Sequence, residues 1–243
     1  MISSSLYTKI QQTLQEQPKK RVLSFTWEEK KYFIKRRISN GRNTFAKQNT
    51  SAAFWCEAYK IMTVRQYAPL APAIVLLTEN YFVMESCGKT MQGVAKEAPW
   101  QEVRLHAFEK AGCSLALLHQ AGLHHGRPAL RDIAYDKEND TITFIDWENE
   151  KTFVSLDTKA LDIFLFIHSC FREKWSVKDS SLIDAALKGY TSVQGSDQQI
   201  RNVKAFIHKH HLLFHVIHNL RRFGWKDVTA VDNARLYIDA LTF

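Results

Sequence analysis

Two aspartates in the middle of the chain have the side chains and spacing for shared chemistry. Asp132 and Asp146 lie fourteen residues apart within "HHGRPALRDIAYDKENDTITFIDWENE", which starts at residue 124. Asp132 precedes a polar turn, and Asp146 ends the apolar run "ITFID". A carboxylate is the ligand that a hard cation such as Mg²⁺ takes, with water completing the shell. Arg127, by contrast, cannot accept a proton, because the pKa of a guanidinium lies above the accessible range.

The elements before these residues are predicted to be mainly strands. After an amphipathic opening at 5–17, the segments "RVLSFTW" and "KYFIKRRI" are rich in β-branched and aromatic residues and predict a hairpin around "EEK". A helix is predicted from Thr50 or Ser51 through "AAFWCEAYKIMTVRQY". "PAIVLLT" and "YFVMES" predict two further strands, and "CGKTMQGVAKEAP" at 87–99 predicts a linker.

The second part of the chain is predicted to be mainly helical. "WQEVRLHAFEKAGCSLALLHQ" carries apolar residues at helical spacing and stops at Gly122. "DIAYD" and "ITFID" predict short strands around the turn "KEND", and later segments are helical in pattern, including 199–224 as one helix. Strands with one helix thus precede helices with one hairpin, which predicts an α+β protein with a small sheet-rich lobe and a larger helical lobe.

Composition indicates the class of protein. The chain has 243 residues, of which 45% are apolar and 24% charged, as in an ordinary soluble globular protein. The longest apolar stretch, "YAPLAPAIVLLT", is too short and too interrupted by proline to span a bilayer, and the first residues lack the apolar region of a secretory signal. Four widely separated cysteines without CxxC spacing indicate reduced thiols. A cytoplasmic location is expected.

The positive charge is concentrated in the first quarter of the chain. Residues 1–60 hold 12 Lys/Arg and 4 Asp/Glu, whereas the remaining 183 residues hold 21 of each, so the net charge of +8 belongs to the first quarter. Such a patch can contact the phosphates of a nucleotide, an anionic membrane surface or a nucleic acid, or can be a solvated face without a partner.

A group of histidines near the C-terminus has a spacing that can bind a transition metal. His208, His211, His215 and His218 follow one another at intervals of three, four and three residues, which places them on one helix face. No cysteine or acid joins them locally. The apolar residues between them, Leu212, Phe214 and Ile217, predict a segment that is mostly core.

From about Arg21 to Tyr190 the order of elements resembles the protein-kinase-like fold, in its lipopolysaccharide-core (Kdo and heptose) kinases, RIO-like kinases and aminoglycoside phosphotransferases. "YFIK" resembles the strand that ends in a phosphate-anchoring lysine, and "YFVMESCGKT" resembles the last strand of the small lobe with its hinge. "GLHHGRPALRDIAYD" with "ITFIDWEN" resembles the catalytic loop and metal motif. The resemblance implies a bilobal fold: a small N-terminal lobe of antiparallel sheet plus one helix at 1–86, and a mainly helical lobe at 87–243.

The resemblance also implies roles for residues of the small lobe and the metal motif. Lys35 would contact the nucleotide phosphates, and it is favoured over Lys31, Arg36 and Arg37 because it ends an apolar triplet. Glu57 would pair with Lys35 and hold its ammonium. The backbone from Glu85 to Cys87 would meet the adenine edge. Asp146, followed by Trp147 and Glu148, would bind Mg²⁺ that bridges the phosphates.

The catalytic loop departs from the family's pattern. His125 and Gly126 align with its opening, which makes His125 a candidate catalytic residue, and the position of the catalytic aspartate is then Arg127. In one register Asp132 is the second metal ligand and a base is missing. In the other, Arg131 and Asp132 correspond to the Arg-Asp pair of the loop and Asp132 is the base. In either register Arg127 would clamp a phosphate instead. A buried aspartate that orders the loop is expected at Asp162, with Asp157 as the alternative.

The activity implied by the resemblance is an ATP- and Mg²⁺-dependent phosphotransferase, a kinase with a hydroxyl acceptor on a sugar, a glycolipid or the lipopolysaccharide core. The short segment between Glu148 and Asp157 argues against a protein kinase with an extended peptide platform. The basic first quarter would contact an anionic membrane surface peripherally, at the inner membrane. The alternative is a pseudokinase that binds nucleotide as a regulatory module, suggested by Arg127 and by the absence of glycine in "VLSFTWEEKK". A RIO-like or protein Ser/Thr kinase is a weaker alternative, and nucleic acid is not an expected partner.

Overall fold

The computed structural model describes residues 2–38, 50–97, 100–147 and 156–242. Arg42 with its loop, Glu148 and most of the short segment before Asp157 lie outside these residues. The chain divides into two compact units. The N-terminal unit comprises Met1–Gly88 and Ile145–Glu148, and the C-terminal unit comprises Lys89–Phe144 and Asn149–Phe243.

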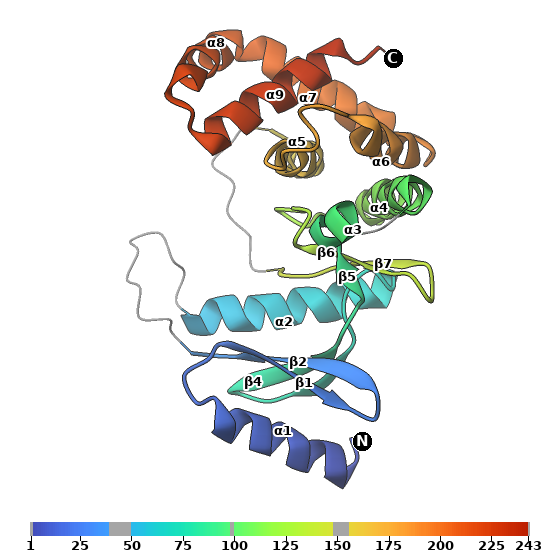
Figure 1. Cartoon of the computed structure of the whole chain (residues 1–243), viewed down its shortest axis with the longest axis vertical. Helices are drawn as coiled ribbons and strands as arrows, with labels where there is room; N and C mark the ends of the chain where they lie inside the picture. The colour runs from blue at the N-terminus through green and yellow to red at the C-terminus, as the bar shows by residue number, and fades with distance from the viewer. Residues whose placement is uncertain (1, 39–49, 98–99, 148–155, 243) are drawn as a thin grey trace. The chain divides into compact units, whose positions relative to one another are not determined.

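An antiparallel sheet forms the centre of the N-terminal unit. Its strands lie in the order β1-β2-β4-β3, and they comprise β1 (Val22–Trp27), β2 (Lys30–Arg36), β3 (Ile74–Leu77) and β4 (Tyr81–Glu85). Helix α1 (Ser4–Glu16) covers one face of this sheet, and α2 (Thr50–Tyr67) lies on the other (Figure 1). Helices thus lie on both faces of the sheet, although the edge strand β1 leaves Val22, Ser24 and Thr26 exposed.

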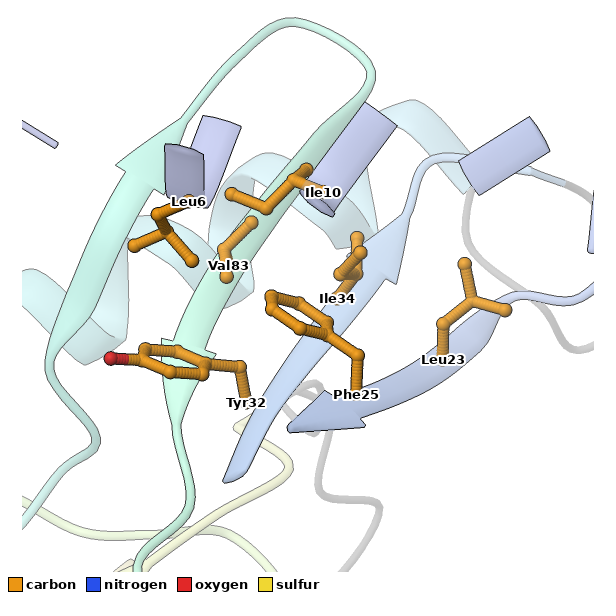
Figure 2. Close-up of a cluster of buried hydrophobic side chains, with 7 residues drawn as sticks. All are labelled: Leu6, Ile10, Leu23, Phe25, Tyr32, Ile34 and Val83. Carbon is orange, nitrogen blue, oxygen red and sulfur yellow. The ribbon is translucent and has the colours of Figure 1, made fainter. Parts of the chain in front are cut away.

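The face toward α1 holds an apolar core. Leu6 and Ile10 lie one helical turn apart on α1, and the hydroxyl of Ser3 caps this helix by accepting from the amide of Leu6 at 3.2 Å. Figure 2 shows these two side chains among residues of three strands, which are Leu23, Phe25, Tyr32, Ile34 and Val83. Burying each such side chain contributes about 2 kcal/mol. The expected amphipathic opening is thus a helix of this unit.

The opposite face of the sheet packs on α2. Because side chains alternate along a strand, Lys35 points away from the face of its neighbour Ile34. Lys35 is paired in register with Phe82, whose ring lies 5.4 Å from that of Phe54 on α2. Glu57 belongs to the buried stripe of α2, one turn after Phe54. Strand and helix periodicity together place a lysine and a glutamate on the same interior face.

A tight turn joins β1 to β2. Glu28 and Glu29 adopt φ values of 45° and 63°, the left-handed region that a two-residue hairpin turn requires. Glycine is the residue that adopts such angles without strain. The position at which a glycine-rich phosphate loop would be sought is therefore occupied by two acidic residues in a short turn.

The C-terminal unit combines a small sheet with helices. The sheet has the order β5-β6-β7, with β5 (Lys89–Thr90), β6 (Ile133–Asp136) and β7 (Thr141–Phe144). The helical elements are α3 (Met91–Glu97), α4 (Gln101–Gln120), α5 (Thr158–Phe171), α6 (Ser181–Thr191), α7 (Asp197–Lys209), α8 (His211–Leu220), the 3₁₀ turn η1 (Arg221–Phe223) and α9 (Lys226–Ala240). Figure 1 shows α5 packed beside α7 and α9.

Helices α4 and α6 approach each other at their backbones. A Cβ added at Gly112 would lie 1.8 Å from the carbonyl oxygen of Ala186, and one at Gly189 would lie 1.9 Å from that of Glu109. Both distances are far below van der Waals contact, so only glycine fits at these two positions. The pair of glycines fixes the close packing of the two helices.

The predicted α+β class is confirmed by the antiparallel sheet with α2 in the N-terminal unit and by the mainly helical C-terminal part. Two local predictions were wrong. The expected linker at 87–99 contains β5 and α3, because Met91, Val94 and Ala95 are buried there. The expected helix at 199–224 is broken at His210, which leaves helical geometry with φ −108° and ψ 30°. Among the described residues, no helix combines the length and apolar character needed to cross a membrane.

Candidate functional site

Lys35, Glu57 and Asp146 come together in the N-terminal unit. The Lys35 ammonium lies 2.7 Å from Oε1 and 2.6 Å from Oε2 of Glu57, and 3.2 Å from Oδ1 of Asp146. β2 supplies the lysine, α2 supplies the glutamate, and the aspartate lies two residues after β7. One ammonium thus bridges two carboxylates that are 89 residues apart in the chain (146 minus 57).

Burial differs sharply within this cluster. Lys35 and Glu57 are buried, whereas the side chain of Asp146 is 34% exposed. Burial raises the pKa of Glu57 above its ordinary value, and the attraction and hydrogen bond of Lys35 lower it only in part. Glu57 therefore serves as an interior counter-charge that holds the lysine in place. Asp146 is the accessible one of the two carboxylates.

The backbone at Asp146 is unusual for a residue with a side chain. Its φ of 65° lies in the left-handed region, which residues other than glycine adopt infrequently, asparagine and aspartate more often than most. Trp147, the next residue, is fully buried. A buried anchor beside a strained residue fixes the direction of the carboxylate, and such strain is concentrated at functional sites. Glu148 of the predicted motif lies outside the described residues.

A second cluster, in the C-terminal unit, holds the backbone of the predicted catalytic loop. The Asp162 carboxylate on α5 accepts from the amides of His125 at 2.6 Å and Gly126 at 2.8 Å. Gly126 has a φ of 94°, which suits glycine alone. Asp157, the alternative considered for this role, caps α5 by accepting from the amide of Lys159 at 3.0 Å.

His119 extends this cluster. Its Nε2 lies 3.2 Å from Oδ2 of Asp162, and its Nδ1 lies 2.7 Å from the hydroxyl of Tyr190. Because a carboxylate only accepts, Nε2 donates to Asp162 and Nδ1 of the neutral ring accepts from Tyr190. Burial, with the charge of Asp162, raises the pKa of Tyr190, so its hydroxyl keeps the proton that it donates. Sequence inspection missed His119; the signal was a histidine six residues before His125 on an otherwise apolar helix face.

Two arginines approach Asp132. Arg127 Nε lies 3.4 Å from Oδ2 of this aspartate, and Arg131 Nε lies 3.5 Å from Oδ1. Asp132 is buried, and its amide donates to the carbonyl of Ala129 at 2.7 Å just before β6 begins. His125, which was predicted to be catalytic, is fully buried, and its Nδ1 accepts from the amide of Arg127 at 3.3 Å. In this loop His125 contributes to backbone geometry.

The predicted hinge residues lie at the end of β4 and directly after it. Glu85 is the last residue of that strand, and the amide of Ser86 donates to the carbonyl of Lys31 at 2.9 Å. The thiol of Cys87 lies 3.6 Å from the carbonyl oxygen of Glu85. The segment therefore stays paired with β2 up to Ser86. Recognition of adenine by Glu85 and Cys87 stays a prediction.

The predicted site residues thus form two groups. Lys35, Glu57 and Asp146 are in contact in the N-terminal unit, and His125, Arg127 and Asp132 are in contact in the C-terminal unit. Across the described ranges, no group of three or more His, Cys, Asp or Glu side chains is arranged to hold a metal ion. A Mg²⁺ ion bound with a nucleotide commonly takes one or two carboxylates and completes its shell with water and phosphate oxygens.

Comparisons with known proteins give distant matches. No family model matches the chain. An uncharacterized protein of Haemophilus influenzae (strain Rd) is 24% identical over 220 residues, which is 89% of each chain. Among solved structures, the co-crystal structure of WbdD and the kinase inhibitor LY294002 matches with a TM-score of 0.45 and 16% identity, over 74% of this chain and 46% of that one. The chain therefore spans less than half the length of WbdD.

Proposed function

We propose that the chain is an ATP- and Mg²⁺-dependent phosphotransferase that phosphorylates a hydroxyl group, on a sugar or a lipopolysaccharide-core type acceptor. The observation that carries the proposal is the Lys35–Glu57–Asp146 cluster. A strand lysine held by a helix glutamate, beside a carboxylate that follows a hairpin, is the arrangement that the kinase-like resemblance implies. The exposure of Asp146 and its strained backbone favour a functional role for it.

The chemistry of the cluster fits a metal-bound triphosphate. Phosphoryl transfer has a loose transition state, so positioning and charge neutralisation supply most of the acceleration. Mg²⁺, when bound, would neutralise charge on the phosphate oxygens. Asp146 would hold the metal because its carboxylate is a hard oxygen donor at the accessible end of the cluster. Lys35, fixed by Glu57, would contact phosphate oxygens with its ammonium. Asp132 would be either the second metal ligand or the base.

Calorimetric titration of nucleotide tests the proposal. We expect the wild-type protein to bind ATP in the presence of Mg²⁺, and Asp146→Asn to weaken that binding at least about tenfold by losing one charged ligand. Asn is isosteric and tolerates the left-handed backbone. Asp140→Asn is the matched control, because Asp140 is also a partly exposed left-handed aspartate, with φ 50°.

Three results would end the proposal. The first is the absence of binding at millimolar nucleotide by a protein whose circular dichroism shows it folded. The second is equal Mg²⁺-dependent binding by Asp146→Asn and by Asp140→Asn. The third is a loss of binding in Asp140→Asn alone, which would move the site away from the Lys35 cluster.

The contact between Arg127 and Asp132 favours a second candidate, a pseudokinase that binds nucleotide without turnover. A guanidinium 3.4 Å from the aspartate competes for the carboxylate that a metal or a substrate hydroxyl would need. Release of phosphate from ATP separates the candidates. A gain in Arg127→Asp would indicate a degenerate kinase, whereas turnover in the wild type that falls in Arg127→Asp would mean that the arginine already acts in the reaction.

A further inference from the structure

Helix α8 presents apolar side chains to solvent. Leu212 and Val216 lie one turn apart with Leu213 beside them, and each is more than half exposed. Phe223 and Trp225 follow, also more than half exposed, with their rings stacked at 5.5 Å. The predicted core segment was wrong in this respect: among the residues of α8, only Phe214 is buried. We call these five exposed residues the α8 patch.

The chain around the α8 patch is basic. Residues 198–226 contain no Asp or Glu and six Lys or Arg, namely Arg201, Lys204, Lys209, Arg221, Arg222 and Lys226. Lys209 and Arg222 flank α8 and are exposed. The acidic residues that border this segment are paired with arginines: Asp197 with Arg201, and the exposed Asp227 with Arg172 at 2.9 Å. Asp232, farther along the chain, is buried and accepts from Arg221 at 2.7 Å. The solvent-facing charge beside the apolar residues is therefore positive.

A cavity of about 490 Å³ opens beside α8, and Leu212 of the α8 patch is among its lining residues. Besides Ile207, Leu212 and Phe214, it is lined by polar residues: His208, His211, His215, His218, Arg235 and Asp239. Imidazole and guanidinium N–H groups donate to phosphate oxygens. Donors for anionic oxygen from α7, α8 and α9 thus gather next to the exposed apolar stripe of α8.

We propose that the α8 patch docks on the surface of an anionic phospholipid bilayer. Leucine, valine, phenylalanine and tryptophan side chains would enter the boundary between headgroups and acyl chains, while Lys209 and Arg222 meet the headgroup phosphates. Charge decides between this occupant and a second copy of the chain. Pairing two such faces would bring like charges together, whereas an anionic surface neutralises them.

The surface assignment is independent of the proposed phosphotransferase, because binding is measured without nucleotide. The experiment is co-sedimentation of the full chain with sucrose-loaded vesicles of phosphatidylcholine alone or with phosphatidylglycerol. We expect binding to the anionic vesicles at least tenfold tighter than to the neutral ones, since each basic residue near an anionic surface strengthens binding roughly fivefold. We also expect the binding to weaken as salt is raised.

Two pairs of substitutions probe the two components of the patch. Leu212→Glu with Val216→Glu should weaken binding to anionic vesicles about tenfold or more, as should Lys209→Glu with Arg222→Glu. Two matched controls should leave binding within about twofold of the wild type. The first reverses the exposed charges of Lys19 and Lys20, and the second changes Leu117, an exposed apolar residue of α4, to Glu.

Four results would overturn the assignment. They are no sedimentation with anionic vesicles, wild-type binding by both patch variants, a loss with Lys19→Glu/Lys20→Glu equal to that of the patch variants, and a concentration-dependent dimer that Leu212→Glu/Val216→Glu abolishes. The last would make a second copy the occupant. Because all substituted residues are exposed, the variants should keep the wild-type thermal midpoint. If one of the two double variants of the α8 patch unfolds, vesicle binding by the other still tests the proposal.

Discussion

Replacing Lys35 with methionine removes the positive member of a buried pair and leaves its partner in place. Glu57 is 1% exposed and loses the ammonium that lies within 2.7 Å of its carboxylate. Asp146, the other neighbour of Lys35, is partly exposed and keeps its hydration, so its change contributes little. The cost of Lys35→Met therefore falls on Glu57, whose pKa burial already raises.

Protonation limits that cost and makes it depend on pH. A buried carboxylate without a counter-charge takes up a proton, and at pH 7 this costs about 3.7 kcal/mol for a group with an unfolded pKa of about 4.3. At pH 5 the same step costs about 1 kcal/mol. In Lys35→Met the folded-state pKa of Glu57 lies above its unfolded pKa, so the folded state holds the proton between pH 5 and pH 7. The stability of the variant therefore falls as pH rises. The expected slope in the variant is about 1.4 kcal/mol per pH unit.

Urea unfolding followed by far-UV circular dichroism at pH 5, 6 and 7 measures this cost. Combining Lys35→Met with Glu57→Gln removes the charge, so the double variant should recover most of the loss at pH 7 and lose the slope. Lys31→Met is the control on the same strand: this lysine is exposed and lies over the ring of Phe33, so we expect a change of about 0.5 kcal/mol at every pH.

The reasoning is refuted if the loss in Lys35→Met is the same at pH 5 and pH 7, or no larger than that of Lys31→Met. Either result would mean that Glu57 is not confined with Lys35 in an interior that excludes water. A double variant, Lys35→Met with Glu57→Gln, that is less stable than Lys35→Met alone would equally refute it, because the lysine would then stabilise the protein through a group other than Glu57.

Two further changes test the packing and electrostatics of the C-terminal unit. In thermal unfolding, Gly112→Ala should destabilise the protein by about 2 kcal/mol, because overlap with the Ala186 carbonyl costs about 3 kcal/mol and the higher helix propensity of alanine returns about 1 kcal/mol. Gly93→Ala in α3 is the control. Its new Cβ meets only the flexible side chain of Lys89, so this change should be neutral or stabilising. Burial alone would raise the pKa of Asp232, but hydrogen bonds from His218, Arg235 and Arg221 lower it overall. The charged carboxylate therefore stabilises the folded protein above the unfolded pKa of about 3.9, and this contribution is lost as pH falls through the folded pKa. Asp232→Asn should cost about 3 kcal/mol at pH 7 and flatten the acid limb of the stability profile; an unchanged acid limb would contradict this account.

Most of the elements that carry the candidate site could be predicted from the sequence, because their signals are local. The hairpin that bears Lys35 and the helix that bears Glu57 have strand and helix patterns with clear boundaries. Alternation along β2 turns Lys35 toward α2, because Ile34 faces the other core, but it places Lys31 on the same face as Lys35. The two lysines differ in burial: Lys31 is exposed near the start of the strand, whereas Lys35 is buried. The hydrogen bonds of Asp162 depend on tertiary packing and could not be read from spacing.

The errors have identifiable physical causes. The segment at 87–99 looked like a linker because α3 is short and contains Gly93, yet burial of Met91 stabilises it as a helix. The break at His210 has no glycine or proline to mark it. The apolar residues of α8 were predicted to be core because leucine, phenylalanine and isoleucine are usually buried, and sequence periodicity does not reveal which face of a helix remains exposed to solvent.

The carboxylate of Asp162 has a consequence for genetics. It ties the backbone at His125 and Gly126 to α5, and through His119 it reaches Tyr190 on α6. Displacing α5 by a substitution at its inner face would therefore move the loop without touching any residue of a recognisable motif. A random screen for inactive alleles should return hits within α5, and they would be wrongly counted as folding defects unless the loop itself were probed.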